Sequence, residues 1–179
     1  MPEQDTGAPP RRLIIVAAAV ALVLAAGIAT LGIFVRSAER NTTGALALPS
    51  VSAPQADSPE CTTLLANLPA TLTSKGATLA RRELAQPAPP ATVAWGEPDP
   101  IVLRCGLERP PELTQTSQLR AVSGMQWLPV EGTGSSTWYI VDRAVYIALT
   151  VPDSAGTGPL QEVTDAVAAH LPAVPLRFG

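Results

Sequence analysis

The sequence contains few of the side chains that usually carry out chemistry. Its 179 residues include one histidine and two cysteines, and only 4% of them are aromatic. This excludes the usual zinc sites, which need three or four ligands that come mostly from histidine and cysteine. The 12 basic and 15 acidic residues give a net charge of −3 without a clustered basic face, so we expect no nucleic-acid partner. We also expect no cofactor and no catalytic nucleophile, because the chain has no glycine-rich phosphate loop and neither a GxSxG motif nor a Ser-His-Asp set.

A long apolar run near the N-terminus is the most distinct feature that is present. Residues 13–35 contain no charged side chain over 23 positions, and arginines flank them on both sides. A helix of this length spans about 34 Å, which is enough to cross the ~30 Å hydrocarbon core of a bilayer. We therefore expect a transmembrane helix over residues 13–35. The alternative is a cleaved signal peptide ending near Gly27-Ile28-Ala29, although the apolar core of such a peptide is only ~7–15 residues long.

The orientation of this helix does not follow from its flanking charges. Two arginines precede the apolar run and two follow it closely, so the basic counts on the two sides are equal. The short N-terminal tail and the content of the C-terminal part favour one orientation. We expect residues 1–12 in the cytoplasm and residues 36–179 outside the cell membrane of a single-pass protein.

The remainder divides into a linker and one domain. Residues 36–58 are rich in Ser, Thr, Pro and Ala and hold few large apolar side chains, which is typical of a flexible linker. Residues 59–179 are sufficient for one modest hydrophobic core. We therefore expect an extracytoplasmic domain over residues 59–179.

The hydrophobic pattern of this domain predicts an α+β fold. A helix is expected from Pro59 to about Asn67, after the capping residue Ser58, and a second helix over residues 159–170. Between them the apolar residues alternate with period two, and Gly132 and Gly134 lie in a hairpin connection. The expected strands cover residues 78–83, 92–95, 101–105, 119–123, 125–130, 137–142 and 144–151. This order predicts a mainly antiparallel sheet with a helix at each end of the domain, both packed on one face.

Cys61 and Cys105 are the only cysteines, and both lie in the domain that we place outside the membrane. In an oxidising compartment, an even number of cysteines favours a disulfide. A disulfide would connect the first helix to a central strand and would stabilise the fold by roughly 4 kcal/mol in the chain-entropy model. The alternative is a metal or redox pair, which the spacing does not support because it is not CxxC.

Arg104 is the candidate binding residue. On a strand, Ile101, Leu103 and Cys105 share one face, whereas Val102 and Arg104 share the other. If Cys105 faces the first helix, Arg104 points away from the core. It then either pairs with an acidic residue or contacts a ligand.

Other candidates have simpler explanations. The acid pairs Glu97/Asp99 and Glu108/Glu112 lie in proline-rich loops, where carboxylates are usually solvated, and we assign no catalytic residue. His170 is expected near the end of the last helix in a structural or exposed position. The domain's large aromatic side chains are expected in the core, with an aromatic-lined binding groove as the alternative. They are Trp95, Trp127, Trp138, Tyr139 and Tyr146.

Two motifs carry a resemblance to a known family: Ala94-Trp95-Gly96-Glu97-Pro98 and Ile101-Val102-Leu103-Arg104-Cys105-Gly106. With them, over residues 60–172, the chain resembles an uncharacterised actinobacterial family of small proteins with one membrane helix and one extracytoplasmic domain. It departs at Ser123 and Asp142 from the more usual Asn and Gly. The resemblance implies an envelope location and paired cysteines, and no known activity.

Together these features predict a non-enzymatic, membrane-tethered protein of the cell envelope. Its domain is expected to bind a protein partner or a component of the cell wall. One alternative is an extracytoplasmic enzyme, such as a wall hydrolase that uses loop carboxylates. Another is a structural subunit held in place by its membrane helix.

Overall fold

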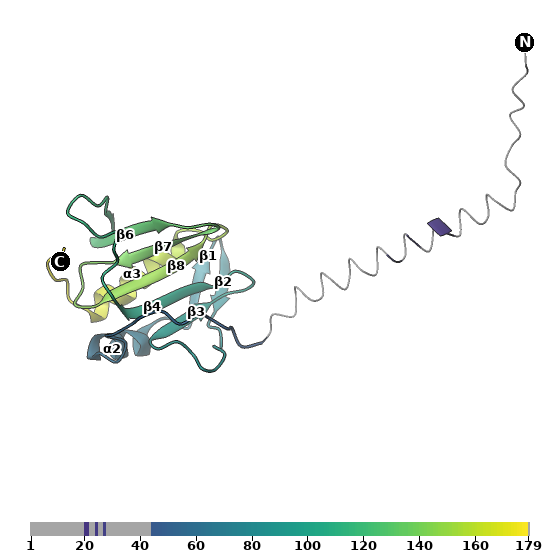
Figure 1. Cartoon of the computed structure of the whole chain (residues 1–179), viewed down its shortest axis with the longest axis horizontal. Coiled ribbons are helices and arrows are strands. Elements are labelled where there is room, and N and C mark those ends of the chain that lie inside the picture. The colour runs from purple at the N-terminus through teal and green to yellow at the C-terminus, as the bar shows by residue number, and fades with distance from the viewer. Residues whose placement is uncertain (1–19, 22–23, 25–26, 28–43, 179) are drawn as a thin grey trace, which may run out of the picture. The chain divides into compact units, whose positions relative to one another are not determined.

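A computed structural model of the chain describes residues 20, 21, 24, 27 and 44–178. The expected transmembrane helix over residues 13–35 therefore lies for the most part outside the described residues. Among the residues that are described, no helix has both the length and the apolar character needed to span a bilayer. The chain from Gly44 onwards forms a compact unit, which is the domain seen in Figure 1.

A six-stranded sheet forms the centre of this domain, with the strand order β3-β4-β8-β7-β6-β5. All neighbouring strands are antiparallel, as predicted. The expected hairpin between Glu131 and Ser136 connects β6 to β7. The strands are β3 (Thr92–Trp95), β4 (Ile101–Leu107), β5 (Arg120–Val122), β6 (Met125–Glu131), β7 (Ser135–Ile140) and β8 (Tyr146–Pro152).

Two helices lie at the ends of the domain sequence, so the predicted α+β class is confirmed. They are α2 (Pro59–Asn67) and α3 (Gly158–His170). The Ser58 side chain accepts a hydrogen bond from the Cys61 N–H at 3.2 Å, which satisfies one of the free N–H groups of the first turn of α2. Both helices contribute to one core cluster, and Figure 1 shows α3 behind the sheet.

The sequence predicted a strand over residues 78–83, but not the small hairpin beside the main sheet to which that segment belongs. Strands β1 (Thr71–Ser74) and β2 (Ala77–Ala80) form their own two-stranded sheet. Lys75 and Gly76, with φ of 49° and 80°, form the two-residue turn between them. Leu72 is the one large apolar residue of β1, and the other buried residue is Ser74, so the sequence shows no apolar alternation that would indicate a strand.

The sheet has one fully covered face and one partly covered face. The face toward the helices holds the main core, in which Trp95 and Trp127 are completely buried. The opposite face, which we call the outer face, carries a smaller cluster that includes Leu107, Leu128 and Ala148. Thus the sheet separates a large core from a surface that is only partly closed.

The start of the domain differs from the prediction. The expected linker extends to residue 58, whereas residues 44–56, which we call the strap, already lie against the folded domain. The Leu46 N–H donates to the Glu83 carbonyl at 2.8 Å, and the Gln55 N–H donates to the Gly106 carbonyl at 3.0 Å. These contacts are made by the backbone, so the polar composition of the segment did not reveal them.

Gly106 permits the strap to approach β4. Its φ is +80°, a conformation that favours glycine, and it lies at a register shift between Cys105 and Leu107. A Cβ atom at this position would overlap the backbone of Gln55 and Ala56. The strap can therefore contact the outer face only because residue 106 has no side chain.

The predicted disulfide between Cys61 and Cys105 is present and joins α2 to β4 across 44 residues of sequence. We expect neither cysteine of the oxidised protein to react with a thiol reagent, even in denaturant. Reduction should expose both thiols and lower the Tm, because the unfolded chain regains the entropy of the open loop. Labelling followed by mass spectrometry and thermal melting measure the two effects. Two reactive thiols in protein taken directly from membranes would contradict this prediction.

Candidate functional site

Strand β4 places Arg104 on the outer face, as its alternation predicted. Ile101, Leu103 and Cys105 are fully buried in the main core on the helix side. Arg104 therefore points to the opposite side of the sheet, where it is half-buried. Its side chain does not belong to the core that holds the domain together.

The neighbours of Arg104 are set by the strand order. In the ladder, Arg104 lies opposite Thr92 of β3 on one side and opposite Ala148 of β8 on the other. Ala148 in turn lies opposite Tyr139 of β7. A single small side chain thus separates the long side chains of Arg104 and Tyr139 on the outer face.

The Arg104 guanidinium lacks the partners that a partly buried cation usually has. Its Nε atom is buried and has no hydrogen-bond partner among the residues that the structure describes. The two ion pairs found in the described domain, Arg82–Glu97 and Asp142–Arg143, do not include it. Removing such a charge from water is unfavourable unless a partner compensates for it.

The electrostatics of Arg104 and Tyr139 are linked. Desolvation by burial lowers the pKa of Arg104, and the nearby phenol of Tyr139 acts in the opposite direction. Desolvation raises the pKa of Tyr139, and the negative charge of Glu112 raises it further, whereas Arg104 lowers it. Cation, phenol and carboxylate are therefore close enough on this face to influence one another.

A cavity of about 170 Å³ adjoins Tyr139 on the outer face. Its walls are Val51 and Ser52 of the strap, residues 107–111 and Tyr139. Two of the lining side chains form a hydrogen bond with each other, because the Ser52 hydroxyl donates to Glu108 at 2.7 Å, and Arg109 donates to the Leu113 carbonyl at 2.6 Å. The charged groups at its rim thus already have hydrogen-bond partners, unlike Arg104.

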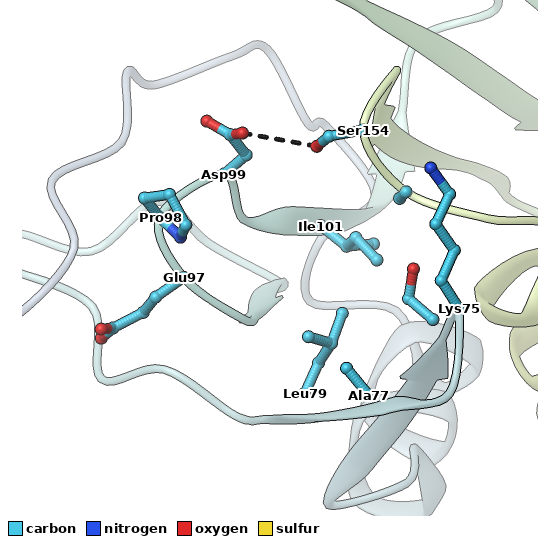
Figure 2. A pocket seen from close by; sticks show the side chains of 10 residues that line it. Lys75, Ala77, Leu79, Glu97, Pro98, Asp99, Ile101 and Ser154 are labelled. Atoms are coloured by element: carbon cyan, nitrogen blue, oxygen red, sulfur yellow. Dashed lines mark hydrogen bonds between the residues drawn. The ribbon is translucent and has the colours of Figure 1, made fainter.

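A pocket of about 180 Å³ contains the loop acids Glu97 and Asp99 (Figure 2). Glu97 forms an ion pair with Arg82 at 3.0 Å, whereas Asp99 accepts a hydrogen bond from Ser154 at 3.4 Å. The two carboxylates point in different directions in Figure 2. They share a pocket but do not converge on one point within it.

The other acid pair is divided between two environments. Glu108 lines the cavity beside Tyr139, whereas Glu112 is exposed and is not among the residues that line it. His170 is an exposed residue at the end of α3. No group of three or more His, Cys, Asp or Glu residues suited to a metal ion occurs in the part of the chain that the structure describes.

Three of the five large aromatic side chains are core residues, as expected. The indole N–H groups of Trp95 and Trp127 donate to the Pro69 carbonyl at 3.0 Å and to Thr164 at 3.2 Å. Tyr146 is also buried. Trp138 and Tyr139 are half-buried on opposite faces of β7.

Trp138 lines a shallow hollow of about 710 Å³ between β5 and the start of α3. The hollow is also lined by Arg120 of β5 and Leu160 of α3, two elements that are far apart in the sequence. Strand β5 has only three residues and forms one edge of the sheet. Such short edge strands resist the addition of a further strand.

The sequence did not predict the position of Tyr139 relative to Arg104. Its alternation with Thr137 places both on one face of a strand, but that pattern does not reveal which strands are neighbours. In the structure, Thr137 shares a hydrogen bond of 3.1 Å with Thr150 one row away from Arg104. The outer face therefore presents a polar band that the separate strand patterns did not predict.

Comparisons with known proteins identify the family but no function. A family model described as a protein of unknown function (DUF3515) matches residues 16–176. Neither a curated protein nor a solved structure matches the chain. The matched range includes residues 94–98 and 101–106, the two motifs on which the resemblance to an uncharacterised family was based.

Replacing Arg104 by glutamine removes the positive charge that lowers the pKa of Tyr139. We therefore expect Tyr139 of the Arg104→Gln variant to titrate at a higher pH than in the parent protein. Phenolate absorbance as a function of pH measures this shift in a Tyr146→Phe background, where Tyr139 is the remaining tyrosine. Arg120→Gln is the control and should leave the titration unchanged. An unaltered or lower Tyr139 pKa in the Arg104 variant would show that the two groups do not interact.

Proposed function

The chain belongs to the DUF3515 family of unknown function, and we propose that it is a single-pass envelope protein whose outer domain is a non-enzymatic binding module. In this proposal, residues 13–35 span the cell membrane, residues 1–12 lie in the cytoplasm and the domain lies outside. The domain binds a protein partner or a component of the cell wall through the outer face of its sheet.

Two features support the location. The uncharged run over residues 13–35 is long enough to cross a bilayer. The Cys61–Cys105 disulfide is typical of a protein domain in an oxidising compartment and rare in the cytosol. Because the strap begins at Gly44, the proposed linker between the membrane helix and the domain consists of residues 36–43, and it is shorter than the linker over residues 36–58 expected from the sequence.

The unpaired guanidinium of Arg104 is the observation that carries the binding proposal. Its Nε atom is buried without a hydrogen-bond partner, although an arginine presents five donors in a planar fork. A half-buried cation in this state is compensated when an anionic group of a partner reaches it. This favours binding at the outer face.

The alternative of a wall hydrolase needs two carboxylates that act together on one bond. Glu97 is neutralised by Arg82, and Asp99 is held separately by Ser154. Glu108 accepts a hydrogen bond from Ser52. These contacts give three of the four loop acids a structural partner, and the fourth, Glu112, is exposed, so they favour the binding module over the enzyme.

The proposed topology predicts the result of proteolysis on intact spheroplasts. Externally added trypsin should cut after Arg36 or Arg40 and release the domain, because the strap that follows is hydrogen-bonded to the fold from Leu46 onwards. Mass spectrometry of the released fragment checks its N-terminus. If the domain stays protected while trypsin cuts at Arg11 or Arg12, the orientation is the reverse of the one proposed.

The proposed binding surface predicts the result of partner recovery from native membranes. We expect Arg104→Ala to lose partners that co-purify with the full-length parent protein, while its free energy of unfolding changes by no more than about 1 kcal/mol. Arg120→Ala is the matched control, because it removes the same charge at the exposed edge strand β5. Equal recovery by both variants would place the binding surface elsewhere. A large loss of stability in Arg104→Ala would show that Arg104 is a structural residue.

A further inference from the structure

The row of side chains that contains Arg104 has a gap at its centre. Across the outer face, the register places Arg104, Ala148 and Tyr139 side by side on β4, β8 and β7. Strands in a sheet are about 4.8 Å apart, so the Cα atoms of Arg104 and Tyr139 are separated by roughly 10 Å. The methyl group of Ala148 thus lies between the longer side chains of Arg104 and Tyr139, each of which ends in a polar group.

The described part of the fold uses neither of these polar ends, and both side chains are only half-buried. The Arg104 Nε atom has no partner among the described residues, and no described residue forms a hydrogen bond with the Tyr139 hydroxyl. Guanidinium and phenol are both hydrogen-bond donors, so together they are complementary to an acceptor group. The planar fork of arginine matches the two oxygens of a carboxylate.

The surrounding charges favour a ligand group with one negative charge. Glu112 is close enough to Tyr139 to affect its ionisation, and Glu108 lies at the rim of the adjoining cavity. Arg109 is at the same rim. The two acids repel a doubly charged phosphate more strongly than a singly charged carboxylate, so the carboxylate is the better fit.

The cavity beside Tyr139 indicates what carries the carboxylate. Val51, Leu107, Pro110 and Pro111 supply apolar walls, and its volume of about 170 Å³ is suited to one side chain. Tyr139 forms the wall that this cavity shares with the Arg104 row. A peptide can therefore place a carboxylate over Ala148 and an adjacent apolar side chain between the strap and residues 107–111.

We propose that Arg104 and Tyr139 form a receptor for the carboxylate of a peptide, whose neighbouring apolar side chain occupies the cavity under the strap. Arg104 supplies the two parallel hydrogen bonds and the charge, and the Tyr139 hydroxyl donates a third hydrogen bond. This assignment rests on the proposed binding function and specifies its ligand chemistry. The carboxylate comes either from a protein or from a peptide of the cell wall, and the experiment distinguishes these sources.

The test measures binding of short labelled peptides to the full-length protein in detergent micelles by fluorescence polarisation. Each probe has a blocked amino end and one apolar residue next to a free C-terminal carboxylate, and its partner probe has the same sequence with an amidated end. We expect the free acid to bind at least about tenfold more tightly than the amide, since amidation removes the charge and leaves the shape. Equal binding of acid and amide overturns the proposal.

Three variants of the proposed residues and one control variant test whether Arg104 and Tyr139 cause the preference. Arg104→Gln should reduce binding of the free acid to the level of the amide, and Tyr139→Phe should reduce it a few-fold. Arg120→Gln is the control and should bind as the parent does. Arg104→Lys keeps the positive charge but lacks the planar guanidinium, so it should retain only part of the preference for the free acid. Thermal melting establishes that each variant is folded. A preference for the acid that persists in Arg104→Gln overturns the assignment.

The configuration of the last residue separates the two sources. Preference for a terminal D-residue indicates a wall peptide, whereas preference for an L-residue or for an internal glutamate indicates a protein partner. The outcome also distinguishes the two proposals from each other. If Arg104→Ala loses its partners while no carboxylate probe shows the preference, the binding module stands and the carboxylate receptor is wrong. If the Arg104 variants change neither partner recovery nor probe binding, the outer face is not the binding surface and the carboxylate receptor is wrong.

Discussion

The disulfide between Cys61 and Cys105 joins helix α2 to strand β4, and the use of both sheet faces depends on this link. Because Cys105 must face the helix, every second residue of β4 joins the core. Arg104 is consequently held on the other side of the sheet, where the helices do not cover it. The direction of Cys105 in the disulfide thus agrees with which face of the sheet is the main core and which face is only partly covered.

The two motifs of β3 and β4 are mostly explained by structure. Trp95 fills the core and donates its indole N–H to Pro69, and Glu97 pairs with Arg82. Cys105 forms the disulfide, and Gly106 admits the backbone of the strap. Arg104 is the member of these motifs for which the described residues provide no partner at Nε.

This contrast gives Arg104 its functional interest. The residues around Arg104 remove water from its guanidinium but do not form an ion pair with it. This disfavours the charged form, so burial lowers the pKa of Arg104. A residue chosen for stability alone at this half-buried position would be apolar or paired. The strap and residues 107–111 shape a cavity next to this cation, so charge and shape are combined at one place on the outer face.

The sequence by itself determined the local structure and the direction of individual side chains. Period-two alternation placed Cys105 inward and Arg104 outward, and an even cysteine count predicted the disulfide. Only the tertiary structure decided that β8 lies between β4 and β7, which places Tyr139 and Arg104 in one row on either side of Ala148, and that the strap folds back onto Gly106. Alternation is a property of each strand alone and can be read from its sequence. Strand order and strap docking depend on backbone hydrogen bonds between distant segments. Almost every residue has the same backbone donor and acceptor, so the sequence does not reveal which segments pair.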